Sequence, residues 1–483
     1  MVNTPNTLRL LTAPALWMGV VQCLFGAISL VAHDDTVAEP FLVPGGAIIL
    51  VAGLLHLLLR TDIRRISYRD ALVFATLTWV LTGVLGALPI YAITGISFTD
   101  AVFESISALT TTGATVLTGL DDMPGSFLMY RQFLQWMGGL GVVIFVVAVL
   151  PMLNVGGMRL LRAEASGPDK DEKVSPRVSR AAHNLWLVYI LITLGCALAY
   201  FLAGMSVFDA VAHSFTTVST GGFSTHDASL GFYDSHLILA VANLFMLLGA
   251  ISFALHFKVL RSGQLHRYWR DEETRVFLLS VAAISLVLAL YLFTSGRYGG
   301  FLEAVSYAAF HLISFITSTG FGHQDLGSWP VAAPVGLILA GYLGGCAGST
   351  AGGSKFVRNI IAFKTVRGDF LLTLHPRAVK KVRYQMQPVA TDVRLSVMAF
   401  FSFVAGSTAL LTLALMATGL DLLSAFSAVA ACLNVLGPGL GQVGSNFQVV
   451  SDLGTWILCA AMILGRLEYF TVLALLFPLF WRY

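Results

Sequence analysis

Charge is what this chain has least of. Only 11% of its 483 residues are charged, whereas 57% are hydrophobic, and the mean hydropathy is +0.80. Soluble domains carry charge on about a quarter of their residues, so this composition excludes an ordinary soluble domain. The apolar stretches have the length of helices, unlike the short alternating segments of an outer-membrane barrel. We therefore predict an all-α integral membrane protein.

Cysteines and catalytic motifs are also scarce. The eleven histidines are scattered, and neither H-E-x-x-H nor G-x-S-x-G occurs. An enzyme in the membrane would need convergent nucleophiles, bases or metal ligands, so we expect no enzymatic activity and no organic cofactor. None of the five cysteines forms a C-x-x-C pair, and we interpret them as small core residues. They are Cys23, Cys196, Cys346, Cys432 and Cys459.

Ten apolar runs are each close to the roughly 20 residues that a bilayer core requires. The eighth is long and is interrupted by glycines. We predict ten transmembrane helices at residues 10–31, 40–59, 70–94, 127–152, 185–204, 236–259, 276–294, 331–361, 395–418 and 454–480.

The basic residues lie almost entirely on one side of these runs. Of 29 lysines and arginines, all but Arg131, Arg297 and Arg466 fall on the side that also holds both ends of the chain. Basic loops mark the cytoplasmic side, so both termini are predicted to be cytoplasmic. The basic stretches 159–180 and 355–394 either only set this topology or also dock a cytoplasmic partner. The net charge of +3 gives no reason to expect nucleic acid.

Acidic residues lie in the opposite, outer loops. Four of them either raise the local cation concentration or are plain solvated loop charges. They are Asp121, Asp122, Asp227 and Asp325.

Four segments after the first two runs resemble one another. They read "FTDAVFESISALTTTGAT", "VFDAVAHSFTTVSTGGFS", "FLEAVSYAAFHLISFITSTGFG" and "LLSAFSAVAACLNVLGPGLG". Near its start, each has an acidic residue or serine directly before an alanine, and a glycine follows after a short apolar stretch. The separation is 13 residues from Asp100 to Gly113, from Asp209 to Gly222 and from Ser424 to Gly437, and it is 17 from Glu303 to Gly320. A recurrence of this kind indicates an internal repeat.

Each repeated apolar stretch is too short to span the bilayer, so we expect it to enter the membrane and turn back. Non-helical backbone at that depth is tolerated where it is buried in protein or lines a watery cavity. Four such hairpins predict one pore with pseudo-fourfold symmetry. Rings of backbone carbonyls can replace the water shell of an alkali cation, and glycine permits the backbone conformation that this requires.

The motifs "TTTGAT", "STGGFS", "STGFGHQD" and "LGPGLGQ", with "GYLGGCAGSTAGGSKFVRN" and "ILGRLEYF", resemble those of the Trk/Ktr/HKT superfamily of potassium-uptake proteins. The resemblance covers nearly the whole chain. It implies two N-terminal transmembrane helices in residues 1–66, followed by four span–pore helix–span repeats. These repeats would occupy residues 67–180, 181–270, 271–385 and 386–483.

The resemblance also implies a carbonyl-lined filter that binds potassium. In plant relatives, serine at the first filter-glycine position goes with sodium permeation, and this chain has Gly113 there. A sodium-favouring relative remains the alternative. The implied filter residues are Thr111, Thr112, Gly113, Thr220, Gly221, Gly222, Ser318, Thr319, Gly320, Val435, Leu436 and Gly437.

The fourth filter segment, within "CLNVLGPGLGQV", differs most from the others because it lacks their threonines and serines. This loss is tolerable if backbone carbonyls coordinate the ion. We therefore expect Val435 and Leu436 to tolerate side-chain changes far better than Gly437.

The eighth run contains "GGCAGSTAGGSK", whose small residues would break a helix or pack it closely against a neighbour. It is not a phosphate-binding loop, because Ser354 stands where G-x-x-x-x-G-K-[ST] needs lysine. The resemblance implies an intramembrane gate below the filter. Lys355 either anchors this loop or reaches for the cytoplasmic surface. The implied gate residues are Gly344, Gly345, Cys346, Ala347, Gly348, Ser349, Thr350, Ala351, Gly352, Gly353, Lys355 and Arg466.

Arg466 is a charge near the middle of the last run. Such a charge is costly in the membrane and faces a cavity or a partner. It either caps carbonyls or pairs structurally, or it faces the pore and repels cations. The resemblance favours the second alternative, with Arg466 and the glycine-rich loop together constricting the path.

The resemblance implies partners as well. Its members work as homodimers in the bacterial inner (plasma) membrane, in contact with membrane lipid. A cytoplasmic, nucleotide-binding TrkA-like ring controls their opening. The sequence alone leaves open whether transport is purely channel-like or is coupled to another ion.

Overall fold

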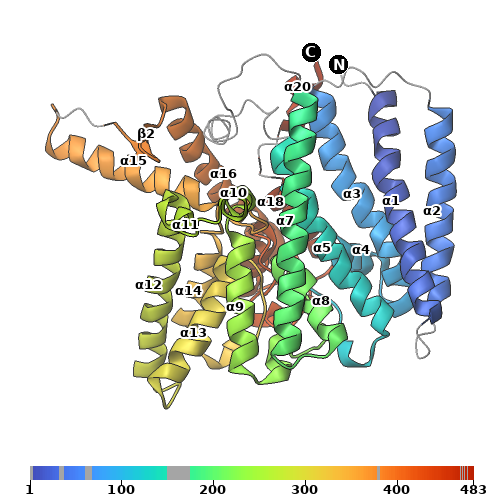
Figure 1. The fold of residues 1–483 in the computed structure, drawn as a ribbon, viewed down its shortest axis with the longest axis horizontal. Coiled ribbons are helices and arrows are strands. Elements are labelled where there is room, and N and C mark those ends of the chain that lie inside the picture. The colour runs from blue at the N-terminus through green and yellow to red at the C-terminus, as the bar shows by residue number, and fades with distance from the viewer. Residues whose placement is uncertain are drawn as a thin grey trace.

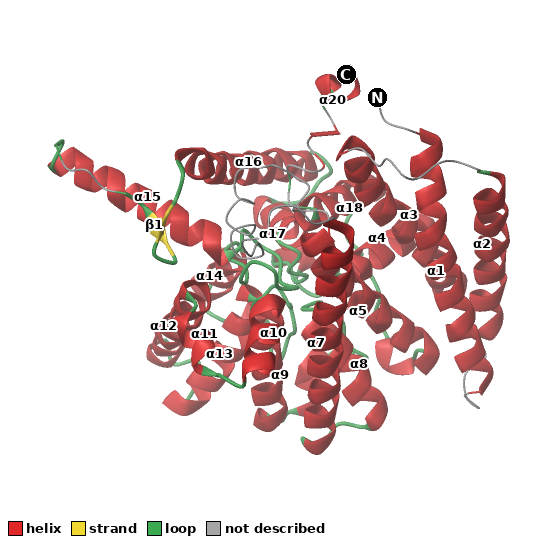
Figure 2. Ribbon diagram, turned by 45° about the horizontal axis from the view of Figure 1, so that its top comes forward, coloured by secondary structure: helices red, strands yellow, loops and turns green. Residues whose placement is uncertain are grey.

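The computed structural model describes residues 4–31, 37–59, 68–148, 174–377 and 381–467, together with residues 469, 472, 474, 475 and 477–482. These residues are mostly helical (Figure 1). Loops gather near the middle of the molecule, with helices around them (Figure 2). The part of the last predicted span beyond residue 467 and the 159–173 part of one basic stretch lie largely or wholly outside the described residues.

Two long helices, α1 (Thr4–Val31) and α2 (Ala38–Leu58), form a hairpin at the start of the chain. After it, a long helix, a short helix and another helix follow one another four times. The long helices are α3 (Tyr68–Thr94), α7 (Val174–Leu202), α12 (Glu272–Thr294) and α16 (Thr391–Met416). The short ones are α4 (Phe98–Leu109), α8 (Val207–Val218), α13 (Phe301–Ile316) and α17 (Leu422–Leu433). The helices that come next are α5 (Gly125–Ala148), α9 (His236–Ala250), α14 (Ala332–Gly341) and α18 (Asp452–Arg466).

The remaining elements connect or extend these helices. The helical ones are α10 (Phe253–Ser262), α11 (His266–Arg270), α15 (Phe356–Leu374) and α20 (Pro478–Arg482). Short 3-10 turns are η1 (Leu120–Asp122), η3 (Ser229–Tyr233), η4 (Leu326–Ser328) and η5 (Gly441–Val443). Strands β1 (Arg383–Tyr384) and β2 (Gln387–Pro388) form an antiparallel pair.

Three of the short helices begin at a polar side chain that caps free backbone N–H groups. Ser97 accepts a hydrogen bond from the Asp100 N–H at 3.0 Å, and Ser206 accepts one from Asp209 at the same distance. Asp421 accepts from the Ser424 N–H at 3.2 Å. Such caps fix where a helix begins and stabilise it by about 1 kcal/mol each.

The outer surface suits a hydrocarbon environment. Among the described residues, six helices are long and apolar enough to cross a membrane: α1, α2, α3, α7, α12 and α16. Only 22% of the most apolar window of α2 is buried inside the protein, and its Leu50 and Leu57 are 68% and 71% exposed. An exposed apolar surface of this extent is typical of helices that face lipid.

The predicted span at 236–259 is wrong as a single straight helix. It is divided into α9 and α10, which meet at an angle of 100°. At the break, the carbonyls of Gly249 and Ala250 accept hydrogen bonds from Thr350 (3.2 Å) and Cys346 (2.8 Å) in a distant loop. This pairing replaces helical hydrogen bonds, so the break depends on tertiary contacts that local sequence does not encode.

The eighth predicted span is interrupted where glycines are frequent. α14 has 10 residues and is followed by an irregular segment, residues 342–355, before α15. Figure 1 shows α15 projecting away from the body of helices rather than running alongside them.

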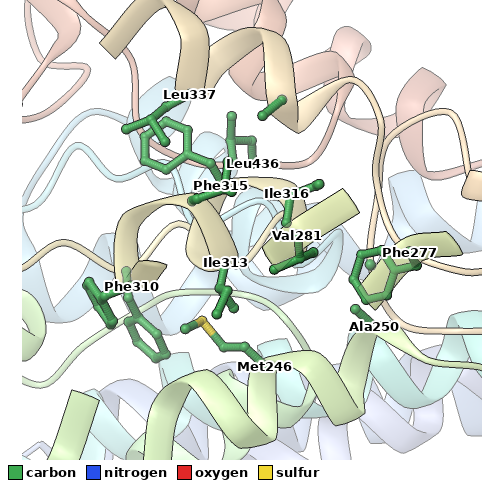
Figure 3. Close-up of a cluster of buried hydrophobic side chains, with 14 of the residues drawn as sticks. Met246, Ala250, Phe277, Val281, Phe310, Ile313, Phe315, Ile316, Leu337 and Leu436 are labelled. Atoms are coloured by element: carbon green, nitrogen blue, oxygen red, sulfur yellow. The ribbon is translucent and has the colours of Figure 1, made fainter. Parts of the chain in front are cut away.

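Two large hydrophobic clusters hold most of the helices together, and a small third one joins α1 to α2. The first large cluster contains residues of helices α7 to α17 and Leu436, and the second contains residues of α1–α5 and α16–α18. Figure 3 shows part of the first, with Leu436 close to Phe315 of α13 and Leu337 of α14. Because both large clusters reach the segments that follow the short helices, they place these segments in the middle of the molecule.

Candidate functional site

Each short helix ends in the same turn. We call these the four glycine turns: turn 1 (110–113), turn 2 (219–222), turn 3 (317–320) and turn 4 (434–437). In every turn the second residue and the final glycine have a positive φ angle. The second residues are Thr111 (57°), Thr220 (53°), Ser318 (54°) and Val435 (57°). The glycines are Gly113 (81°), Gly222 (77°), Gly320 (83°) and Gly437 (94°).

The turns also share one hydrogen-bond pattern. In turn 1, Thr111 N–H donates to the Ala108 carbonyl at 3.0 Å and Thr112 N–H donates to the Ser107 carbonyl at 2.8 Å. The corresponding pairs recur at matching positions in the other three turns. A positive φ is strained for β-branched residues such as Thr111 and Val435. Strain of this kind persists only where the surroundings enforce it, and it concentrates at functional sites.

The four turns close into a ring. A Cβ atom on any of the four glycines would lie closer than 3.0 Å to a carbonyl oxygen of a neighbouring turn. Gly113 faces the Gly221 oxygen, Gly222 faces Thr319, Gly320 faces Leu436, and Gly437 faces Thr112. The order therefore runs from turn 1 through turns 2, 3 and 4 and back to turn 1. Glycine is required at these positions both for its φ angle and for the close approach.

The irregular segment 342–355 packs against three of the turns, on the side where the short helices end. In turn 2, Thr220 Oγ1 donates to Thr350 Oγ1 at 3.3 Å. Thr350 Oγ1 in turn donates to the carbonyls of Val218, just before turn 2, and Gly249 at 3.0 Å each. The Gly352 N–H donates to Ser318 Oγ at 2.5 Å. The Gly353 N–H donates to the Asn434 carbonyl at 3.2 Å. We call this segment the crossing loop, because it joins turns 2, 3 and 4.

Arg466 ties the crossing loop to α18. Its Nη1 donates to the Thr350 carbonyl at 2.8 Å, and the residue is 5% exposed. Within the described part of the chain, its Nε and Nη2 atoms have no hydrogen-bond partner. The guanidinium thus caps a carbonyl of the loop while part of its donor capacity remains unused.

Lys355 closes the base of the crossing loop. It is 8% exposed, and its ammonium donates to the Ala351 carbonyl within the same loop. This contact favours the loop-anchoring alternative over a lysine that reaches for the membrane surface.

Sequence reasoning missed Glu273, at the start of α12. Its Oε1 accepts hydrogen bonds from the N–H groups of Ala347 (2.8 Å) and Val357 (2.9 Å), and the residue is 6% exposed. One carboxylate thus joins the middle of the crossing loop to the first turn of α15, which directly follows the loop. Glu273 lies among charged residues that flank a membrane span, and nothing local distinguishes it from them.

Glu273→Ala is expected to loosen the crossing loop. The change leaves two buried N–H groups without an acceptor, at a cost of about 1–3 kcal/mol each. Cys346 lies in this loop and is 1% exposed, so labelling of its thiol reports loop opening. We expect labelling of Cys346, measured by mass spectrometry, to accelerate roughly tenfold. Glu273→Gln keeps an acceptor oxygen and should label more slowly than Glu273→Ala; equal and unchanged rates for both variants would refute the proposed anchor.

The loops that follow turns 1 and 2 are joined by acidic residues. Asp227 accepts from the N–H groups of Gly119 (2.9 Å) and Leu120 (3.2 Å). Asp121 pairs with His226 Nδ1 at 2.5 Å, and this hydrogen bond lowers the pKa of the Asp121 carboxyl. Both carboxylates are therefore hydrogen-bonded between the two loops, although both residues are exposed. Asp325 instead caps η4, where it accepts from the Gly327 N–H at 2.8 Å.

Leu436 and Val435 are almost fully buried, with exposed fractions of 0% and 1%. The Leu436 side chain packs in the cluster of Figure 3, close to the position of Gly341. Tolerance of substitution at these positions stays a prediction, but the burial gives large-to-small changes a packing cost of about 2–5 kcal/mol.

All twelve residues predicted for the filter lie in the four glycine turns. The residues predicted for the gate, from Gly344 to Gly353 with Lys355, lie in the crossing loop, and Arg466 contacts it. The arrangement brings four backbone carbonyls into one ring, with the crossing loop and the buried Arg466 guanidinium beside it.

Comparison with known proteins gives consistent matches. Residues 41–480 match the TrkH family model, described as cation transport protein. The chain is 42% identical over 466 residues to the Trk system potassium uptake protein TrkH of Vibrio parahaemolyticus, covering 96% of both chains. It is 43% identical over 425 residues to TrkH of Escherichia coli, covering 88% of both. The crystal structure of the potassium transporter TrkH from Vibrio parahaemolyticus aligns with a TM-score of 0.92 at 39% identity, covering all of both chains.

Proposed function

The chain belongs to the TrkH family of cation transport proteins, and from this premise we propose that it takes up potassium across the bacterial inner membrane. Its relatives are named potassium uptake proteins of the Trk system, which is a transport system and not an enzyme. It is a multi-pass membrane protein. We further propose that its four repeats surround one pore and that both termini face the cytoplasm.

The observation that carries the proposal is the closed ring of glycine turns. Four carbonyls at matched positions, those of Thr112, Gly221, Thr319 and Leu436, lie next to the glycines of neighbouring turns. A potassium ion would exchange its hydration shell for such carbonyl oxygens, which coordinate without a net charge. Backbone coordination also explains why turn 4 can do without threonine or serine.

The proposed gate lies on one side of this ring. The crossing loop contacts turns 2, 3 and 4, and Arg466 donates to its Thr350 carbonyl. Two buried guanidinium nitrogens have no hydrogen-bond partner among the described residues, and in the proposed gate their positive charge faces the path of the ion. In a low dielectric, that charge repels an entering cation. We propose that opening requires the loop and Arg466 to move together.

Growth rescue tests the proposed function. The chain is expressed, with its regulator, in a bacterium that lacks potassium uptake, and growth is measured at low potassium. We expect rescue by the wild type and reduced rescue by Gly113→Ser. Failure of the wild type to rescue growth, with expression confirmed, would contradict the proposal. If sodium and potassium competed equally with rubidium uptake, the sodium-permeable alternative would be favoured.

Two partners are part of the proposal. A Trk system implies further subunits, and we propose a cytoplasmic TrkA-like ring that binds nucleotide and controls opening. We also propose a homodimer. The helix α15 projects from the body (Figure 1) and carries exposed apolar residues at helical spacing, which lipid alone or a second copy would cover. They are Phe363, Val366, Phe370 and Leu374.

Phe370→Asp is expected to weaken the homodimer. Phe370 is 69% exposed, and a charge on this face would be buried without a partner in a dimer. Light scattering of the detergent-purified protein should give the mass of a dimer for the wild type and of a monomer for Phe370→Asp. Val287→Ser, on the exposed face of α12, is the control and should remain dimeric. A dimeric Phe370→Asp would remove α15 from the interface.

A further inference from the structure

Turn 2 lacks a side chain where the other turns have one. Gly221 corresponds to Thr112, Thr319 and Leu436. Unlike Gly222, Gly221 has no positive φ angle, so its backbone conformation does not require glycine. A Cβ at Gly221 would lie closer than 3.0 Å to the side-chain amide atoms of Gln135. The space that a side chain of turn 2 would use is therefore occupied from α5.

Gln135 holds turn 2 at two points. Its Nε2 donates to the Gly221 carbonyl at 2.7 Å, and its Oε1 accepts from the Phe223 N–H at 3.1 Å. The residue is fully buried. Both hydrogen bonds flank Gly222, so one amide fixes the orientation of the backbone on either side of this glycine.

One helical turn earlier, α5 holds turn 1 as well. Arg131 forms a buried ion pair with Glu104 of α4. Glu104 also accepts from Thr115 Oγ1 (3.0 Å) and the Val116 N–H (3.1 Å), just after turn 1. The Arg131 guanidinium lies 4.2 Å from the centre of the Phe223 ring. Residues four apart share a helix face, so one face of α5 joins turns 1 and 2.

Among the described residues, the corresponding helix position of the other repeats makes no such polar contact with a turn. In every repeat, the helix that follows the short helix contacts the end of the short helix through a glycine. These glycines are Gly138, Gly249, Gly341 and Gly465. Three residues before these glycines stand Gln135, Met246, Ile338 and Met462. Only the first is polar. At this helix position the ring is therefore held by side-chain hydrogen bonds in one repeat, between turns 1 and 2, whereas the three corresponding residues are apolar; turns 2, 3 and 4 have their polar contacts to the crossing loop instead.

We propose that Gln135 is a positioning residue that sets ion selectivity. The inference rests on the proposed potassium uptake. The Gln135 amide replaces the missing side chain of turn 2 and fixes the direction of the Gly221 carbonyl. A carbonyl held in this way cannot move inward to coordinate a smaller ion, so its loss favours sodium relative to potassium.

The first test replaces Gln135 with methionine, the residue at two of the corresponding positions. Rubidium uptake into proteoliposomes is measured with potassium or sodium as competitor. We expect Gln135→Met to lower the preference for potassium over sodium as competitor roughly threefold to tenfold, the factor expected for the loss of the hydrogen bond that holds the Gly221 carbonyl. The ratio does not depend on how much protein folds, so a merely structural role would leave it unchanged.

Gln132→Met is the matched control. Gln132 is also buried in α5, but its side-chain oxygen and nitrogen have no hydrogen-bond partner among the residues that the structure describes. Removing an unpaired amide should leave the competition ratio at the wild-type value. An equal shift in both variants would overturn the specific role of Gln135.

A second pair of variants tests the shared space directly. Gly221→Ala places a methyl group against the Gln135 amide and should lower uptake strongly. Adding Gln135→Ala frees that space, so the double variant should transport better than Gly221→Ala alone. This cycle remains informative if Gln135→Met does not fold. No recovery in the double variant would overturn the inference.

The outcomes separate the inference from the proposed function. A wild type without rubidium uptake would refute the proposed function itself. A wild type that selects potassium, together with an unchanged ratio in Gln135→Met, would refute only the role of Gln135.

Discussion

Gly222→Ala is expected to abolish rubidium uptake. Gly222 has a φ of 77°, and a Cβ there would lie closer than 3.0 Å to the Thr319 carbonyl oxygen. The strained φ alone costs about 1–3 kcal/mol, and the clash displaces an oxygen of the next turn. Because the turns form a closed ring, a shift in one wall changes the others. Uptake should fall at least about tenfold, since displacement of roughly 1 Å can cost far more than that.

Gly263→Ala is the control for this experiment. Gly263 also has a positive φ, 64°, but a Cβ there meets nothing within 4 Å. It follows α10, far from the glycine turns in sequence. We expect this variant to keep wild-type uptake and to lose about 1–3 kcal/mol of stability, because it has the same positive φ but no clash with another turn. Wild-type uptake by Gly222→Ala in proteoliposomes would contradict the assignment of the ring as the path of the ion.

Arg466→Ala is expected to raise ion flow in the absence of the regulator. The substitution removes a positive charge near the path and the hydrogen bond to the Thr350 carbonyl. If the crossing loop is the proposed gate, both losses lower the barrier that it presents to a cation. An interaction worth about 1.5–3 kcal/mol, typical of a hydrogen bond to a charged group, corresponds to roughly a tenfold to hundredfold rise in uptake without regulator.

Arg466→Lys separates the two contributions to the barrier. Lysine keeps the charge but lacks the planar fork that reaches the Thr350 carbonyl. We expect uptake between those of the wild type and Arg466→Ala. If conductance and uptake without the regulator were unchanged in Arg466→Ala, this residue would not be part of the gate.

The glycine turns could be located from sequence because their requirement is local. A residue that must adopt positive φ next to a neighbouring carbonyl has to be glycine, so Gly113, Gly222 and Gly437 recur at one spacing. The longer spacing to Gly320 also has a local cause, because α13 has 16 residues and the other three short helices have 12.

The contacts that hold the turns and the crossing loop in place could not be predicted from the sequence in the same way. Gln135 and Glu273 act on backbone groups 86 and 74 residues away along the chain. The break between α9 and α10 depends on hydrogen bonds from Cys346 and Thr350. Such partners are set by the packing of whole helices, and one sequence contains no local pattern that pairs them.

The central claim is that a ring of four glycine turns passes potassium in preference to sodium. Purified wild-type protein in liposomes, assayed for rubidium uptake with potassium or sodium as competitor, tests this claim most directly. We expect the wild type to take up rubidium, and potassium to suppress this uptake at a much lower concentration than sodium does. Gly222→Ala should show no uptake. Absent uptake by the wild type, or equal suppression by both ions, would contradict the claim.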